Sequence, residues 1–311
     1  MEEKGMNGMK TTPRRFIKRL QARIRRDRKT FILYSVLRVL VIVVAVRTFL
    51  EGNLESFAIC ILSLILFLLP AFAEERFKIE IPPLFEGIIY LFIFAAEILG
   101  EIDHFYINIP GWDTMLHTIN GFVCAAVGLS MVYLLNAKSD NLNLSPFYLV
   151  VAAFCFSMTV GVIWEFIEFS MDQVFYLDMQ KDFIVQNIGS VTLDPTHSQI
   201  PVKVSGITRT LIETSAGKTY TVEGGYLDIG IIDTMKDLFV NFVGAIVFDL
   251  FGYVMLKKNP GHMFVDGLII RQMTSEEKEE AQEIVQKSYE KPDAVRKIEK
   301  KAAALKKQDK K

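Results

Sequence analysis

The chain has 311 residues, of which 51% are hydrophobic, and its formal net charge is −1. This near-neutral total identifies no partner, and we expect no nucleic-acid binding because no stacking aromatic residues interleave the basic run near the N-terminus. The three cysteines, Cys60, Cys124 and Cys155, lie in apolar segments and form no Cys-x-x-Cys pair. This pattern argues against a disulfide framework and against a thiolate metal site.

The first 29 residues are predicted to be a basic cytoplasmic N-terminus. Between Lys10 and Lys29 the chain carries ten Lys and Arg residues against one acid, Asp27. A basic run beside a first membrane helix usually marks the cytoplasmic side of the membrane and contacts anionic lipid.

Six apolar segments follow, each about 20 residues long, as expected of helices that cross a bilayer core about 30 Å thick. We expect these spans at residues 31–50, 56–73, 84–99, 115–135, 146–169 and 235–256. The predicted fold class is therefore an all-α integral membrane protein, with a six-helix transmembrane bundle over residues 30–256.

The Lys and Arg residues of the links between spans predict the orientation. Links 51–55 and 100–114 carry none and are placed outside, whereas links 74–81 and 136–145 carry Arg76, Lys78 and Lys138 and are placed inside. The charged tail, residues 257–311, is also placed inside, and from Thr274 onward it is expected to be solvated helix. We thus predict a multi-pass protein of the cell membrane, in contact with lipid, with both termini cytoplasmic.

The long loop at residues 173–232 is predicted to be a small β-rich insert outside the membrane. Alternating β-branched residues over 208–222 indicate a hairpin with its turn at Ser215–Lys218. We expect two to four strands in this insert.

Polar residues recur at helical spacing at the predicted outer ends of four spans, so each set lies on one helix face. The sets are Glu97 and Glu101; Asp113, His117 and Asn120; Glu165, Glu168 and Asp172; and Asp233, Asp237 and Asn241. Ionisable groups in a bilayer cost roughly 2.5 kcal/mol or more each and usually face a shared interior. We therefore expect the four stripes to line an outward-opening polar cavity, with Gly244 and Ala245 allowing close helix packing beside it.

An imidazole among several carboxylates suits general acid/base chemistry, or a site for Mg²⁺, Mn²⁺ or Zn²⁺. The candidate catalytic residues are Asp113, His117, Glu165, Glu168 and Asp237. The candidate metal ligands are His117, Glu165, Glu168, Asp172 and Asp237, and the supporting residues are Glu97, Glu101, Asn120, Asp233 and Asn241. A hydrogen-bonded packing network without chemistry explains the same residues, because structural ion networks often imitate functional ones.

The ordered segments LGEIDHFY, WDTMLH, GVIWEFIEFSMD and DIGIIDTMKDLFVNFVGA resemble the YjdF-like family of uncharacterised bacterial inner-membrane proteins. The chain is more distantly similar to the VanZ-like family, which is linked to glycopeptide-antibiotic resistance. The VanZ-like pattern maps onto Asp113 and His117, Glu165 and Glu168, and Asp237, Asn241, Gly244 and Ala245. The insert over residues 173–224 departs from that pattern, and neither family supplies an established reaction.

Three functions are compatible with this sequence. The first is an envelope enzyme or binder that acts on a lipid-linked or cell-envelope molecule at the outer leaflet. The second is a proton-coupled transporter that uses the carboxylates as relays, although the stripes cluster at one leaflet and no inverted repeat is evident. The third is a structural or partner-binding membrane protein.

Overall fold

The computed structural model describes residues 28–138, 143–258, 267–272 and 274. The predicted basic N-terminus up to residue 27 and the predicted helical tail from residue 275 onward lie outside the described residues. Six helices of the described chain are long and apolar enough to cross a membrane, which confirms the predicted number of spans. They are Arg28–Leu50, Leu54–Phe77, Pro83–Ile102, Trp112–Asn136, Pro146–Phe175 and Ile231–Lys257.

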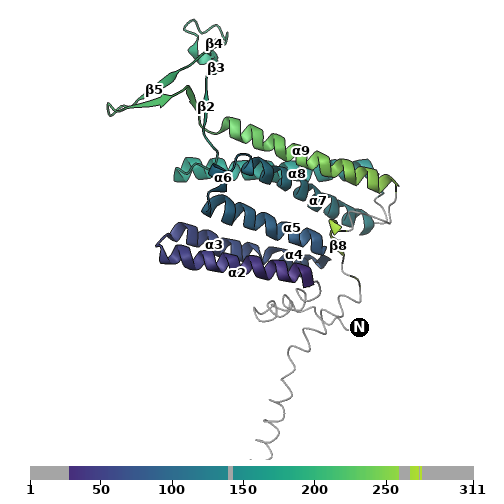
Figure 1. Ribbon diagram of the computed structural model, residues 1–311. Coiled ribbons are helices and arrows are strands. Elements are labelled where there is room, and N and C mark those ends of the chain that lie inside the picture. Colours follow the sequence, from purple (N-terminus) through teal and green to yellow (C-terminus); the bar gives the residue numbers. More distant parts are fainter. Residues whose placement is uncertain (1–27, 139–142, 259–266, 273, 275–311) are drawn as a thin grey trace, which may run out of the picture. The chain divides into compact units, whose positions relative to one another are not determined.

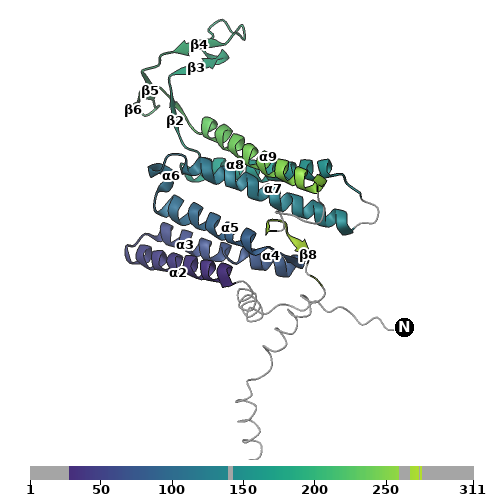
Figure 2. The ribbon, with the colours of Figure 1, turned by 45° about the vertical axis from the view of Figure 1, so that its right-hand side comes forward.

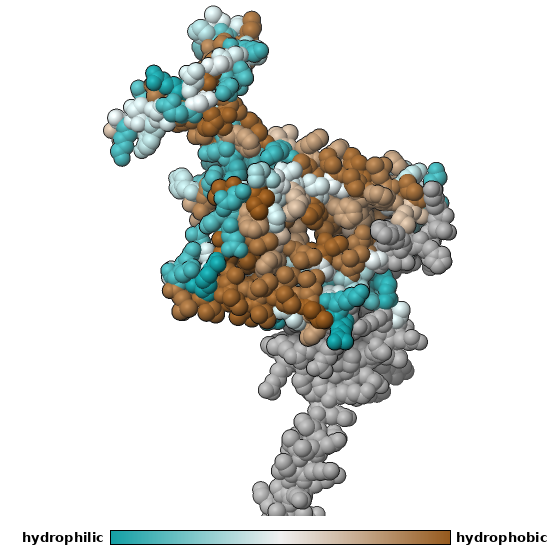
Figure 3. Space-filling model, viewed as in Figure 1, coloured by the Kyte–Doolittle hydropathy of each residue, from teal (hydrophilic) through white to brown (hydrophobic). Residues whose placement is uncertain are grey.

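The outer surfaces of these helices are apolar, as a lipid-facing surface must be. Large apolar side chains such as Val43, Phe166 and Phe251 are more than half exposed. Figure 3 shows apolar side chains over the helices and more hydrophilic ones over the strands that join α8 to α9. The chain is therefore a multi-pass helical membrane protein.

The chain divides into two compact units, Met1–Ile98 with Asp266–Lys311 and Leu99–Val265. In the first unit, α2 (Arg28–Leu50) packs against α3 (Leu54–Leu66) and α5 (Pro83–Ile93). The rings of Tyr34, Phe67 and Tyr90 meet in its core with centroids 5.1–6.2 Å apart. A short antiparallel pair joins β1 (Ile79–Glu80) to β8 (Arg271–Gln272).

The second and third spans depart from the uninterrupted helices that the apolar pattern predicts. The second breaks between α3 and α4 (Leu69–Phe77), because Pro70 in the first turn of α4 has no N–H to continue the ladder of α3. The third passes from α5 into a π-helix, η1 (Phe94–Ile102). Insertions of this kind often mark functional sites.

The second unit holds the short α6 (Phe105–Asn108) and three long helices: α7 (Trp112–Lys138), α8 (Pro146–Phe175) and α9 (Ile231–Lys258). These three helices pack against one another and lie side by side in both ribbon views (Figures 1 and 2). α7 and α9 run parallel and α8 runs antiparallel to them, so the start of α7, the end of α8 and the start of α9 share one end of the bundle.

The strands of the predicted β-rich insert (residues 173–232) lie within residues 183–228, here called the β arm. It extends from the end of the bundle where α8 stops and α9 starts (Figure 2). The predicted hairpin forms between β5 (Arg209–Glu213) and β6 (Thr219–Glu223). The expected two to four strands were too few: the arm has three antiparallel pairs, because β2 (Phe183–Val185) pairs with β7 (Tyr226–Asp228) and β3 (Asn187–Ser190) pairs with β4 (Val202–Ser205).

Candidate functional site: an acid/histidine cluster in the α7–α8–α9 bundle

The close contact of α7 and α9 depends on two glycines. A Cβ atom built on Gly121 would lie 2.0 Å from the backbone oxygen of Asn241, and one built on Gly244 would lie 2.0 Å from that of Thr118. No other residue type fits at either position, since a real Cβ does not approach a carbonyl oxygen so closely. The sequence prediction that Gly244 permits close packing agrees with this geometry, and Ala245 beside it is fully buried.

This contact brings the predicted His117 on α7 beside the predicted Asp237 on α9. His117 Nε2 lies 4.0 Å from Asp237 Oδ2 and 3.5 Å from Asp113 Oδ1, one turn earlier on α7. One ligand-type atom from each of the three residues lies within 4.8 Å of the other two. His117 is 9% exposed and Asp237 1% exposed, whereas the side chain of Asp113 is 28% exposed, so the cluster reaches the surface at Asp113. We call these three residues the acid/His triad.

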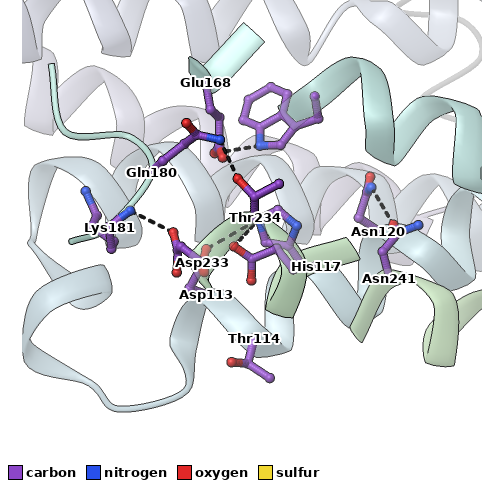
Figure 4. Close-up of polar contacts among 12 residues, drawn as sticks. Asp113, Thr114, His117, Asn120, Glu168, Gln180, Lys181, Asp233, Thr234 and Asn241 are labelled. Atoms are coloured by element: carbon purple, nitrogen blue, oxygen red, sulfur yellow. Dashed lines mark hydrogen bonds and ion pairs between the residues drawn. The ribbon is translucent and has the colours of Figure 1, made fainter. Parts of the chain in front are cut away.

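A layer of amides lies below the triad along the bundle. Asn120 on α7 donates to Asn241 Oδ1 on α9 over 3.0 Å (Figure 4). Asn241 also lies against Gly161 of α8, and Ser157 of α8 donates to the backbone oxygen of Gly121 over 2.8 Å. The two predicted supporting asparagines thus join all three helices and fix the depth at which the triad forms.

α8 contributes the two predicted glutamates to the same bundle. Glu165 is 4% exposed, and its Oε2 has no hydrogen-bond partner within the described chain. Glu168 is 7% exposed and accepts a hydrogen bond of 2.8 Å from Trp164 Nε1. Both glutamates have Asp113 among their electrostatic neighbours, so α8 belongs to the same charged cluster.

The two outermost predicted acids hold the segment that leads into the β arm. Asp172, at the end of α8, accepts backbone N–H groups of Met179 and Gln180 over 2.7 and 2.9 Å. Asp233, at the start of α9, accepts the N–H of Lys181 over 2.7 Å (Figure 4). Side-chain carboxylates that accept backbone N–H groups stabilise local chain conformation. Both residues therefore stabilise the segment between α8 and the β arm.

Sequence reasoning did not single out Gln180 and Thr234, whose side chains bond to each other above the triad (Figure 4). Neither residue stands at a helical spacing that would have flagged it, and their contact depends on how residues 176–182 fold back. It also passed over Asp249 on α9, a buried carboxyl with neither oxygen hydrogen-bonded within the described chain. Its position inside an apolar span could have identified Asp249 from the sequence.

The predicted supporting residues Glu97 and Glu101 both lie in η1, where the chain passes from the first unit to the second. Glu97 belongs to the first unit, and the triad belongs to the second. The site is therefore described by the side chains of α7, α8 and α9 alone.

The cluster carries more negative than positive charge. Lys236 is a basic neighbour of His117 and Asp233, but its Nζ lies 5.4 Å from the ring of Phe183 at the base of the β arm. The negative region continues outward to Asp178, Asp172 and Asp182. Partial burial, and then the nearby carboxylates of Asp178 and Asp172, raise the pKa of Asp182. Such a site can exchange a proton through His117 or hold a cation, and it disfavours an unaccompanied anion.

Residues 31–258 match the family described as "Predicted membrane protein (DUF2238)". This match is consistent with the resemblance to the YjdF-like family, and the VanZ-like similarity stays a prediction. No curated protein and no solved structure matches the chain.

Proposed function

The chain belongs to the DUF2238 family of predicted membrane proteins, and we propose that it binds or processes the headgroup of a lipid-linked or cell-envelope molecule at the acid/His triad. The observation that carries the proposal is the convergence of Asp113, His117 and Asp237 at the buried, arm-bearing end of a membrane bundle. Ionisable residues held inside a membrane protein generally mark a substrate or ion site.

The triad suits a headgroup better than a transport pathway. The acids of α7 and α8 and the first acids of α9 gather at one end of the bundle, which the Lys/Arg pattern places at the outer leaflet. Apolar flanks on α8 and α9, including Phe166 and Phe239, are exposed and can accommodate an acyl or prenyl chain beside the site. Nε2 of His117 faces the carboxylates of Asp113 and Asp237, so this group of side chains can exchange a proton with a bound headgroup or hold a cation that binds the headgroup.

The proposal is tested by extracting the protein from native membranes with its surrounding lipid and identifying the retained lipids by mass spectrometry. We expect the wild type to retain one headgroup class above its abundance in the membrane, and His117→Ala and Asp237→Asn to lose that enrichment. Asp249→Asn is the matched control, because it removes another buried aspartate of α9 at a distance from the triad. Equal lipid profiles for wild type and triad variants would overturn the proposal. Substrate-dependent proton flux in liposomes would then support the transporter instead.

A further inference from the structure

We propose that Asp113, His117 and Asp237 are the ligands of a first-row divalent metal ion, Zn²⁺ or Mn²⁺. The role of the ion in binding a headgroup rests on the proposed function. The binding of the ion itself is tested without any lipid. The ligand set differs from the one that helical spacing suggests, because it takes Asp113 and leaves out the acids of α8.

The distances fit an ion. Three atoms that lie within 4.8 Å of one another always have a common point no farther than about 2.8 Å from each, and zinc–ligand bonds are about 2.0–2.2 Å. The remaining difference is at most about 0.6–0.8 Å per ligand, which side-chain rotations can supply. The His117 pairs of 3.5 and 4.0 Å are already close to the spacing of about 3.4 Å between neighbouring ligands in a tetrahedral site.

A second observation points to a ligand at the same place. Only 1% of Asp237 is exposed, and its Oδ1 accepts no hydrogen bond within the described chain. A buried carboxylate oxygen without a donor is costly, and native structures usually satisfy it. A cation between Asp237, His117 and Asp113 would satisfy this oxygen or its partner on the same carboxylate and offset the charge of the surrounding acids.

Distance and hydrogen bonds together separate the other acids from the triad. Glu165 has a buried oxygen without a hydrogen-bond partner, but it is not among the described residues whose ligand atoms lie within 4.8 Å of one another. Asp172 and Asp233 accept backbone N–H groups at the base of the β arm, and Glu168 accepts the indole N–H of Trp164. These carboxylates already hold N–H groups in place, and none of them belongs to the group of ligand atoms within 4.8 Å of one another. Within the described chain, the ion pairs of the triad join its own members.

The ligand types select the class of metal. The imidazole suits Zn²⁺, and the two carboxylates also suit Mn²⁺, whereas Ca²⁺ and Mg²⁺ take oxygen ligands. Three protein ligands also leave coordination positions open, as in catalytic rather than structural zinc sites. A headgroup oxygen could occupy such a position.

The test uses the full-length protein purified in detergent, stripped with EDTA and titrated separately with ZnCl₂, MnCl₂ and MgCl₂. Bound metal is measured by mass spectrometry after gel filtration, and the visible absorption of Co²⁺ reports the coordination geometry of the site. We expect about one Zn²⁺ or Mn²⁺ per chain and a rise in Tm that grows with metal concentration, since the ion binds only the folded state. Mg²⁺ should reproduce neither effect at the same concentration.

The variants make the test specific. Asp237→Asn and His117→Ala should weaken metal binding at least 100-fold. If either variant fails to fold, Asp113→Asn replaces it, because Asp113 is the most exposed of the three ligands. Asp249→Asn and Asp172→Asn should keep one metal per chain. Substoichiometric metal in the wild type, or equal affinity in the triad variants and the controls, would overturn the inference. Metal binding without lipid enrichment would support the ion site and contradict the proposed function. Lipid enrichment without metal binding would support the proposed function and contradict the ion site.

Discussion

Among single residues, the buried aspartates of α9 differ in whether the fold has a use for their charge. Asp233 accepts the backbone N–H of Lys181, whereas Asp249 has no hydrogen-bond partner within the described chain. A buried carboxyl group without a partner destabilises a membrane protein, and the cost is about 2.5–3.5 kcal/mol at the centre of a span.

We therefore expect Asp249→Ala to raise the free energy of unfolding by about 1–3 kcal/mol. Asp233→Ala is the matched variant on the same helix and should lower it by about 1–3 kcal/mol, because it leaves a backbone N–H without its acceptor. Unfolding in mixed micelles of dodecyl maltoside and SDS measures both values. A loss of stability in Asp249→Ala would show that the carboxyl has a partner of its own.

Asp194 in the β arm provides a pH-dependent contact outside the spans. Its carboxylate accepts hydrogen bonds from the side chains of Ser198 and Thr196 and from their backbone N–H groups. The Ser198 hydroxyl, then that of Thr196, holds the pKa of Asp194 well below its usual range. Because the folded pKa is depressed, the stabilisation is complete above the unfolded pKa of about 3.9 and is lost as the pH falls through the folded value.

Hydrogen exchange should reveal this dependence at the Thr196 and Ser198 amides. Their protection factors should be constant from about pH 7 to about pH 5 and should fall below about pH 4. In Asp194→Asn the protection should be lower throughout and nearly independent of pH. Wild-type protection that does not change down to pH 2.5 would contradict the assigned role of the carboxylate.

At the scale of helices, the glycine contact between α7 and α9 explains why the triad forms at all. Gly121 follows His117 by one turn, and Gly244 follows Asp237 by two turns. Their missing Cβ atoms allow the two backbones to touch, so the side chains one or two turns away meet across the gap. Small residues play this role commonly in membrane helices, where close packing replaces the hydrophobic effect.

Gly244→Ala should separate α7 from α9 and lower the free energy of unfolding by about 3 kcal/mol or more, because the new methyl group meets a rigid backbone oxygen. Gly252→Ala is the control on the same helix. Its Cβ would meet the flexible end of Leu129 at 3.2 Å and two other side chains at ordinary contact distances of 3.8 and 4.0 Å, and alanine is the better helix former. The two variants should therefore differ clearly in SDS unfolding, and equal stabilities would contradict the close crossing.

The elements that follow from local chemistry could be predicted from the sequence, and those that depend on distant contacts could not. Length and hydropathy predicted six spans, and the helical spacing of Asp113, His117 and Asp237 placed them on inward faces. The π-helix η1 and the pairing of β2 with β7 across about 40 residues leave no such local signal. The choice of Asp113 over Asp172 as a member of the triad depends on which carboxylates the backbone already uses.

At the scale of the whole molecule, the proposal requires the β arm and the triad to face the outside. A reporter that works only outside the cytoplasm should be active when it is fused after Gln199, in the arm. A reporter that works only in the cytoplasm should be active when it is fused after Lys311. The physical reason is the excess of Lys and Arg in the links assigned to the inside. Paired alkaline phosphatase and green fluorescent protein fusions measure both positions, and an inverted result at either one would reverse the predicted orientation.

The central claim is that residues of α7 and α9 form one coupled site, and a double-mutant cycle between His117→Ala and Asp237→Ala in EDTA tests it most directly. The two side chains lie 4.0 Å apart and are buried, so the free energies of unfolding should be non-additive by about 0.5–3 kcal/mol. The same cycle between His117→Ala and Asp249→Ala is the control and should be additive within about 0.3–0.5 kcal/mol. Additivity in the His117–Asp237 cycle would contradict the account.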